Sequence, residues 1–387
     1  MTGRSQLVAA GIAMVGTAFG LARYGYGLLL PEIRGSFGLS NAALGLIATG
    51  SYVAYLLTTA GVALGGDRAG PRRPVLIGGC AAVGGMVLIA VARSPWVLAL
   101  GVVVAGASAA LVYPPFSAAV ASSVQRPRQG RALAMISSGT GWGVAVAVPI
   151  ALLAGTDWRW AWVAFAAIGV LATLLAARAL RAVSAADGGG EAVPPLSWSW
   201  FVCPRSGPLL VGALLVGVGA SVYWTFAADF ASSGTGSRAA GPVLLGVVGV
   251  SSLVGSGAGD MLERMGGRLA LVVSAAGLAG SMCALAIWHG SWFGIALSAA
   301  AFGSTYNLLL ALQAIWSARV FAQRPATGLA AMLFMLGVGQ VVGPVLAGVL
   351  ADGVGLAAAF FAGGALIALA GLLPPREELR AGATLPA

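Results

Sequence analysis

The turn Ala63-Leu64-Gly65-Gly66-Asp67-Arg68-Ala69-Gly70-Pro71-Arg72-Arg73 separates two long apolar segments of this chain. A second version follows later as Gly259-Asp260-Met261-Leu262-Glu263-Arg264-Met265-Gly266-Gly267-Arg268. The two copies lie about half a chain length apart, and Glu263-Arg264-x-Gly266 takes the place of Asp67-Arg68-x-Gly70. A repeat at this spacing predicts two related halves.

The composition is that of an integral membrane protein. Of the 387 residues, 59% are hydrophobic and 8% are charged, which leaves a soluble domain too little polar surface. The net charge of +10 is spread over the loops, so we expect no nucleic-acid partner. The three cysteines and the single histidine lack metal-ligand spacing, so we expect no cofactor or metal.

Twelve apolar runs are separated by charged residues or by proline and glycine. They lie near 7–30, 42–65, 74–92, 96–121, 132–154, 159–179, 207–229, 240–262, 268–288, 291–318, 327–350 and 354–373. A helix needs about 20 apolar residues to cross the hydrocarbon core, so each run predicts one span. The first run resembles a secretory signal, but the eleven similar runs after it favour a membrane span.

The longest polar interval, near 180–206, divides these spans six and six. It predicts an N-terminal bundle over 1–180, a cytoplasmic linker over 181–206, a C-terminal bundle over 207–374 and a cytoplasmic tail over 375–387. A second repeat, in which Arg126-Pro127-x-x-Gly130 returns as Arg324-Pro325-x-x-Gly328, supports the duplication. The predicted fold class is an all-α membrane protein with twelve transmembrane helices in two pseudo-symmetric six-helix bundles.

The arginines predict the orientation. If the N-terminus is inside, sixteen arginines fall in inner segments: Arg4, Arg68, Arg72, Arg73, Arg126, Arg128, Arg131, Arg178, Arg181, Arg205, Arg264, Arg268, Arg319, Arg324, Arg376 and Arg380. Four fall in outer loops: Arg34, Arg93, Arg159 and Arg238. The positive-inside rule therefore places both termini in the cytoplasm.

Two halves of six spans, with an acid-Arg-x-Gly turn after the second span and again after the eighth, resemble the major facilitator superfamily. The Arg23-Tyr24-Gly25-Tyr26 stretch and the Tyr113-Pro114-Pro115 break further resemble a bacterial branch, the YbfB/YjiJ-type transporters. The signature turn departs from the family pattern at Ala63, Gly65 and Pro71, where glycine, leucine and a basic residue are usual.

The resemblance implies a cytoplasmic gate, in which the acid of the turn docks at the start of span 11, near Pro325-Ala326-Thr327. The positive end of a helix dipole favours a carboxylate there. The gate residues carried over from the family are Asp67, Arg68, Gly70, Arg72, Arg131, Glu263 and Arg264. The alternative is that these loop charges only fix the topology.

A second family signature, a glycine-x-x-x-Gly-Pro motif in span 5 of exporters, is matched poorly. Span 5 has Gly139, Gly141 and Gly143 with a displaced Pro149, while Gly343-Pro344 in span 11 lies closer to that spacing. The resemblance therefore favours export without establishing it. The arginine that this family often carries in span 4 is missing, which puts a proton route through it in doubt.

Arg23 is the sharpest candidate for a substrate contact, because an arginine inside a span is costly and is normally retained for a ligand, a counter-ion or a water-filled cavity. It lies about 16 residues, or roughly 24 Å, from the inner end of span 1. Predicted substrate-binding residues are Arg23, Tyr26, Trp142, Tyr223, Trp224, Asn307 and Gln340. Gln313 is a further polar residue within a span, and any such residue is alternatively a hydrogen-bonding group of the core.

Asp229 lies on span 7, the counterpart of span 1 in the other half. We expect Arg23 and Asp229 to form an outer gate pair or to take part in proton coupling. The alternative is that Asp229 is a loop residue beyond the membrane. No acid lies deep in spans 1–6, so Asp229 and His289 are the remaining titratable candidates.

The leading interpretation is a secondary active transporter, with proton-driven efflux of small drug-like or metabolite molecules by alternating access. The alternative is uptake or exchange of a small organic anion, with Arg23 as its charge partner. A lone histidine argues against an enzyme, whereas a channel would not need gates at both ends. The expected setting is the bacterial inner membrane, with a lipid bilayer, a small-molecule substrate and protons as partners of a monomer.

Overall fold

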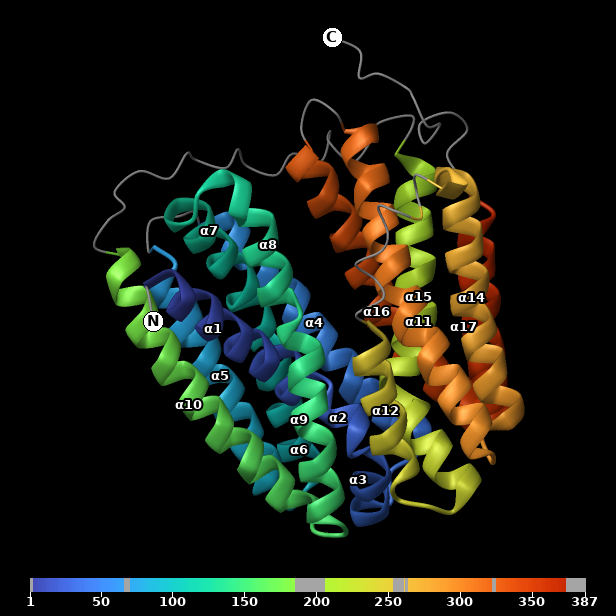
Figure 1. Cartoon of the computed structure of the whole chain (residues 1–387). Coiled ribbons are helices and arrows are strands. Elements are labelled where there is room, and N and C mark those ends of the chain that lie inside the picture. Colours follow the sequence, from blue (N-terminus) through green and yellow to red (C-terminus); the bar gives the residue numbers. More distant parts are fainter. Residues whose placement is uncertain are drawn as a thin grey trace. The chain divides into compact units, whose positions relative to one another are not determined.

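The computed structural model describes residues 3–65, 70–184, 206–252, 261, 264–321 and 325–373. Within these ranges every regular element is a helix (Figure 1). Contacts divide the chain into two compact units. Unit 1 comprises Met1–Gly38 and Gly50–Leu196, and unit 2 comprises Leu39–Thr49 and Ser197–Ala387.

Ten helical stretches of the described chain are long and apolar enough to cross a membrane. Two shorter apolar helices, Ala240–Ser251 and Leu356–Gly371, lie at the eighth and twelfth predicted spans. The all-helical membrane prediction is confirmed. The count of twelve spans, the cytoplasmic termini and the domain bounds stay predictions.

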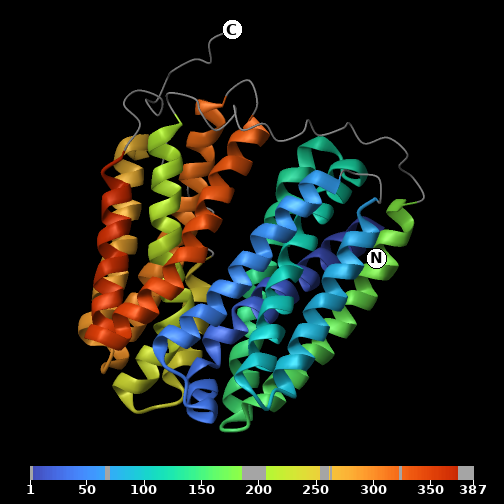
Figure 2. The same cartoon turned by 180° about the vertical axis from the view of Figure 1, so that it is seen from behind.

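The elements of unit 1 begin with a first span that is not one continuous helix. They are α1 (Gly3–Val15), η1 (Gly16–Arg23), α2 (Gly25–Leu28), α3 (Leu30–Phe37), the later part of α4 (Asn41–Gly65), α5 (Arg72–Ala90), α6 (Pro95–Ser108), η3 (Ala109–Leu111), α7 (Tyr113–Ser123), α8 (Arg126–Ser137), α9 (Gly139–Ala154) and α10 (Trp158–Ser184). The long helices α5 and α10 run side by side (Figure 2).

Unit 2 contains the first residues of α4 and six helices from the second half of the chain. These are α11 (Gly207–Thr235), α12 (Ala240–Ser251), α14 (Gly267–Trp288), α15 (Trp292–Val320), α16 (Pro325–Val354) and α17 (Leu356–Gly371). Helix α11 packs on α16 and α17, and α14 packs on α15 and α17 (Figure 1).

Two predicted spans are broken where the sequence analysis expected single helices. Span 1 changes from α- to π-helix at Gly16, and span 5 is divided into α8 and α9 at Ser138. The predicted break at Tyr113-Pro114-Pro115 is confirmed, because α7 begins at Tyr113 with proline in its first turn. Proline fits a first turn, where its missing N–H would have no intrahelical acceptor.

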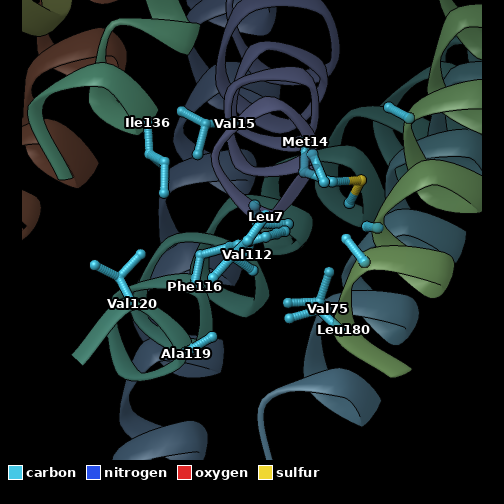
Figure 3. Close-up of a cluster of buried hydrophobic side chains, with 14 of the residues drawn as sticks. Leu7, Met14, Val15, Val75, Val112, Phe116, Ala119, Val120, Ile136 and Leu180 are labelled. Atoms are coloured by element: carbon cyan, nitrogen blue, oxygen red, sulfur yellow. The ribbon is translucent and has the colours of Figure 1, made fainter. Parts of the chain in front are cut away.

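The core of unit 1 forms where the first half of span 1 meets α5, α7, α8 and α10 (Figure 3). Leu7 and Met14 of α1 are buried together with Phe116 of α7, Val75 of α5 and Leu180 of α10. Lipid tails are as apolar as these side chains, so close van der Waals packing rather than escape from water stabilises such a contact in a bilayer. This packing holds the helix that leads into η1.

Candidate functional site

The second half of span 1 is a π-helix. Eight residues, Gly16–Arg23, form η1, and the N–H of Tyr24 donates to the carbonyl of Phe19 at 3.0 Å, five residues back. π-Helices are rare and frequently lie at functional sites. Arg23, the sharpest candidate in the sequence, is the last residue of η1.

Glycines bring η1 directly against the backbone of α9. A methyl group on Gly20 would lie 2.6 Å from the Cα of Gly143, and one on Gly16 would lie 2.9 Å from the carbonyl oxygen of Gly139. Only residues without a side chain allow this approach. The contact fixes where η1, and hence Arg23, sits inside unit 1.

Three aromatic rings surround the guanidinium of Arg23. Its central carbon lies 4.2 Å from the ring centroid of Tyr55, 4.7 Å from that of Tyr52 and 5.8 Å from that of Phe19. The side chain is 8% exposed. A cation over aromatic rings is stabilised by about 2 kcal/mol or more when water is excluded. We call Arg23, Phe19, Tyr52 and Tyr55 the arginine cage.

Sequence reasoning missed two members of the arginine cage. Tyr52 and Tyr55 lie three residues apart on α4, a spacing that places both rings on one face of the helix. This spacing was the sequence pattern that could have identified them. Tyr26, a predicted substrate contact, is buried in the following helix, α2.

The other predicted contacts are scattered. Trp142 is 61% exposed and comes directly before Gly143, the residue that meets η1. Asn307 lies half-buried in α15, and Gln340 lies buried in α16. The structure does not bring these three residues together within one unit, because Trp142 belongs to unit 1 and the other two to unit 2.

Tyr223 and Trp224 belong to an aromatic cluster inside unit 2. The Tyr223 ring stacks on Phe302 at 3.8 Å between centroids, and Trp224 meets Phe302 edge-on at 5.5 Å. The hydroxyls of Tyr223 and Ser298 share a hydrogen bond of 3.0 Å, and Ser298 donates to the carbonyl of Ser281 at 2.7 Å. Tyr223 is therefore fixed on both its face and its polar end.

Asp229 lies within α11 and is 6% exposed. It is thus a buried residue of a long apolar helix, not a residue of a loop. Arg23 belongs to unit 1 and Asp229 to unit 2. Their pairing stays a prediction.

Three residues of the predicted cytoplasmic gate, Asp67, Arg68 and Glu263, fall outside the described residues. Gly70 and Gly266 occupy equivalent places in the two turns and have positive φ angles of 61° and 74°. Glycine alone adopts this left-handed conformation without strain. Both turns thus share a backbone requirement, in agreement with their sequence repeat.

The arginines of the predicted gate differ in exposure. Arg72 is half-buried at the start of α5, whereas Arg131 and Arg264 are exposed. Their proposed docking partners lie outside the described chain or lack described side chains.

A second feature that sequence reasoning missed is a close contact inside unit 2 between the start of α4 and the end of α16. The backbone N–H groups of Asn41 and Ala42 donate to the carboxylate of Asp352 at 2.8 and 2.9 Å. Further along, the hydroxyl of Thr49 donates to the carbonyl of Val341 at 2.8 Å. A carboxylate at a helix N-terminus satisfies orphan N–H groups and the helix dipole.

Glycines make this contact between α4 and α16 possible. A methyl group on Gly45 would overlap the carbonyl oxygen of Pro344, and one on Gly348 would overlap the carbonyl oxygen of Asn41. We call the contact formed by Asn41, Gly45, Thr49, Gly348 and Asp352 the α4–α16 seam. Because α4 continues from unit 2 into unit 1, the seam lies on the one described helix that both units share.

Apolar helices that are long enough to cross a membrane and that pack through glycine define a polytopic membrane protein. A sequence profile of the Major Facilitator Superfamily matches residues 12–279. The chain therefore belongs to the major facilitator superfamily of membrane transporters. The narrower resemblance to the YbfB/YjiJ-type branch stays a prediction.

Solved structures with the same fold agree with this assignment. A bacterial homologue of the human lysosomal transporter Spinster, in an inward-facing and occupied conformation, is 18% identical with a TM-score of 0.77, covering 96% of both chains. The nucleoside transporter NupG is 13% identical with a TM-score of 0.76, covering 96% of this chain and 98% of its own. No curated protein matches the sequence. At these identities the likeness concerns the fold alone.

The packing of η1 on α9 yields a first testable prediction. We expect Gly20→Val to lower the melting temperature of the purified protein by about 3 °C or more, because overpacking costs about 1–3 kcal/mol. Gly84→Val is the matched control, since a methyl group on Gly84 meets nothing within 4 Å. Equal melting temperatures for the two variants would contradict the close packing of η1.

Proposed function

We propose that this protein is a secondary active transporter that moves small organic molecules across the bacterial inner membrane by alternating access. In such carriers two bundles rock about a central site. We further propose proton-driven efflux as the direction and coupling, as the family resemblance favours. The single observation that carries the proposal of a substrate site is the arginine cage at the end of η1.

The physical argument rests on the cost of a charge within a span. A central arginine costs at least about 2.5–3.5 kcal/mol on insertion scales, and such residues face the protein interior, a water-filled cavity or a partner. Phe19, Tyr52 and Tyr55 take up the flat faces of the guanidinium. A guanidinium recognises planar acceptors such as a carboxylate in bidentate fashion, which makes Arg23 the candidate charge partner of an anionic substrate.

The same cage also suits a flat or amphipathic molecule, because the rings of Tyr52 and Tyr55 offer apolar surface beside a cation. In unit 2, Trp224 is the better candidate for a direct contact than Tyr223, whose hydroxyl is engaged by Ser298 and whose ring stacks on Phe302. We propose that Tyr223 positions this aromatic cluster while Trp224 contacts the substrate.

A second candidate function is uptake or exchange of a small organic anion. The observation that favours it is the positive charge of Arg23 itself, buried to 8% exposure. A buried cation attracts an anion far more strongly than a surface charge does, because the surrounding dielectric constant is low. Drug-like neutral molecules would gain much less from this charge.

Counterflow in proteoliposomes tests carrier function directly. The purified protein is first screened by thermal shift against drugs, sugars and organic acids, because a bound ligand raises the melting temperature. Any stabilising compound is then loaded unlabelled inside vesicles, and a carrier accumulates the labelled compound transiently. Stabilisation without counterflow would contradict the transporter proposal.

Imposed proton gradients then distinguish proton-driven efflux from exchange of an anion. Proton-driven efflux predicts that substrate moves against the direction of proton flow, and that a protonophore abolishes the accumulation. Accumulation that is insensitive to the gradient would support exchange of an anion and contradict proton coupling.

The outer gate pair is a separate proposal. We expect Asp229→Asn to change transport and the accessibility of the site from outside, because a neutral amide removes the charge proposed to attract Arg23. The buried position of Asp229 within α11 supports a role inside the protein. The matched control is Asp157→Asn, an exposed acid before α10. Unchanged transport and accessibility in Asp229→Asn would rule out the gate pair.

A further inference from the structure

A small cavity lies inside unit 2, apart from the arginine cage. Its volume is about 10 Å³. The lining residues come from α14, α15 and the end of α17 and are Leu271, Ala275, Leu309, Gln313, Trp316, Ala370, Gly371 and Leu373. All of them are apolar except Gln313 and the indole nitrogen of Trp316.

Gln313 has an unmet hydrogen-bonding requirement at this cavity. Its side chain is 3% exposed, and its Oε1 has no hydrogen-bond partner among the described residues. An amide buried without a partner costs about 1–3 kcal/mol on mutational scales. Native proteins rarely leave such a group unsatisfied, and ordered water is the usual remedy.

The end of α17 supplies further acceptors to the same place. This helix ends at Gly371, and the last four carbonyls of a helix have no intrahelical donor. The N–H groups of Leu372 and Leu373 donate to the carbonyls of Leu369 and Ala370, at 3.0 and 3.2 Å. Each of these carbonyl oxygens keeps a second lone pair.

Gln313 and the α17 carbonyls come close to one point. A methyl group placed on Gly212 of α11 would lie 3.7 Å from Nε2 of Gln313 and 4.0 Å from the carbonyl oxygen of Ala370. These distances place the donor end of the Gln313 amide near α17, whereas its acceptor Oε1 is the end without a partner among the described residues. Because Oε1 and the α17 carbonyls are all acceptors, a ligand held by both must donate hydrogen bonds.

We propose that this cavity binds one water molecule, held between the side-chain carbonyl of Gln313 and the carbonyl end of α17. This volume is about that of the smallest cavity that holds one water molecule. A metal cation is disfavoured, because hard cations take six or more oxygen ligands, whereas most of the lining is apolar. The water ties α15 to α17 and explains how a glutamine is retained in an apolar span.

X-ray hydroxyl-radical footprinting of the full-length protein in lipid nanodiscs tests the site. Radicals formed from a bound water oxidise the side chains next to it, so we expect Trp316 to be labelled although it is only 3% exposed. Trp158 is the internal reference and should stay at background, because it is 1% exposed, its indole N–H donates to the hydroxyl of Ser36 at 2.8 Å, and it does not line this cavity. Labelling of Trp316 at the level of Trp158 would overturn the proposal.

Two variants sharpen the test. Gln313→Met keeps the length of the side chain but removes the amide, and we expect it to reduce Trp316 labelling at least fivefold. Gln340→Met, another buried glutamine that does not line the cavity, should leave the labelling unchanged. Equal Trp316 labelling in the wild type and in Gln313→Met would overturn the role of Gln313. Loss of Trp316 labelling when sodium chloride replaces choline chloride would assign the site to a cation instead of water.

Discussion

Replacement of Arg23 by glutamine is expected to abolish counterflow of an anionic substrate while only reducing export of a neutral one. The guanidinium is the cation of the arginine cage, and its removal takes away a charge-assisted contact in a site of low dielectric constant. Hydrogen bonds to charged groups contribute about 1.5–3 kcal/mol, which corresponds to roughly a 10- to 100-fold loss of affinity. Radiolabelled counterflow in proteoliposomes measures this loss.

Arg159→Gln is the matched control for Arg23→Gln. Arg159 is also held by aromatic rings, at 4.4 Å from Trp158 and 6.0 Å from Phe37, and it donates to the carbonyl of Ala92 at 2.9 Å. It lies in the first turn of α10, so its loss should affect stability without affecting anion transport. Arg23→Lys keeps the charge but loses the planar fork, and we expect intermediate transport.

The outcome for Arg23→Gln separates the two proposed functions. Selective loss of anion counterflow supports an anion carrier, and equal modest losses for both substrates support efflux of neutral molecules. If anion and neutral transport both survive unchanged, Arg23 has no part in substrate binding. Its role would then be confined to packing among Phe19, Tyr52 and Tyr55.

The helical membrane fold was predictable from composition and from the lengths of the apolar runs, because a bilayer permits few alternatives to a helix. The break at Tyr113-Pro114-Pro115 was predictable too, since proline carries its own backbone constraint. Arg23 could be singled out because a charge inside a span is costly wherever the helix points. These predictions depend only on the residues of one segment and not on how the segments pack together.

The π-helix and the arginine cage depend on tertiary packing instead. The glycines at 16 and 20 were visible in the sequence, but nothing in span 1 alone shows that they meet Gly143 on α9. The rings of Tyr52 and Tyr55 reach Arg23 from another helix, and that proximity depends on how α4 packs against η1. Likewise, Asp352 lies more than three hundred residues from the N–H groups it binds.

Gly45→Leu is expected to reduce counterflow to less than about a tenth of the wild-type rate. Even a methyl group on Gly45 would overlap the carbonyl oxygen of Pro344, so a leucine side chain prevents the α4–α16 seam from forming. Overpacking of this kind costs about 1–3 kcal/mol, and about 1.4 kcal/mol changes a conformational equilibrium tenfold. We propose that the transport cycle passes through a conformation in which this seam is formed.

The control for the seam is Gly353→Leu, near the end of the same helix α16, where a methyl group meets nothing within 4 Å. It should transport normally. Gly348→Leu should reproduce the defect, because a methyl group on Gly348 would overlap the carbonyl oxygen of Asn41 on the other side of the seam. Two opposed positions with one phenotype would exclude a purely local effect on either helix.

Accessibility distinguishes a seam that fails to close from a protein that fails to fold. In a background without reactive native cysteines, Asn41→Cys should react slowly with a membrane-impermeant maleimide, because the N-terminus of α4 is capped by Asp352 and packed on α16. Adding Gly45→Leu should speed the reaction while ligand-induced thermal stabilisation persists, since the folded protein then stays in states with the seam open. Slow labelling together with normal counterflow in Gly45→Leu would show that α4 and α16 need not pack through this glycine, and that transport does not require the seam.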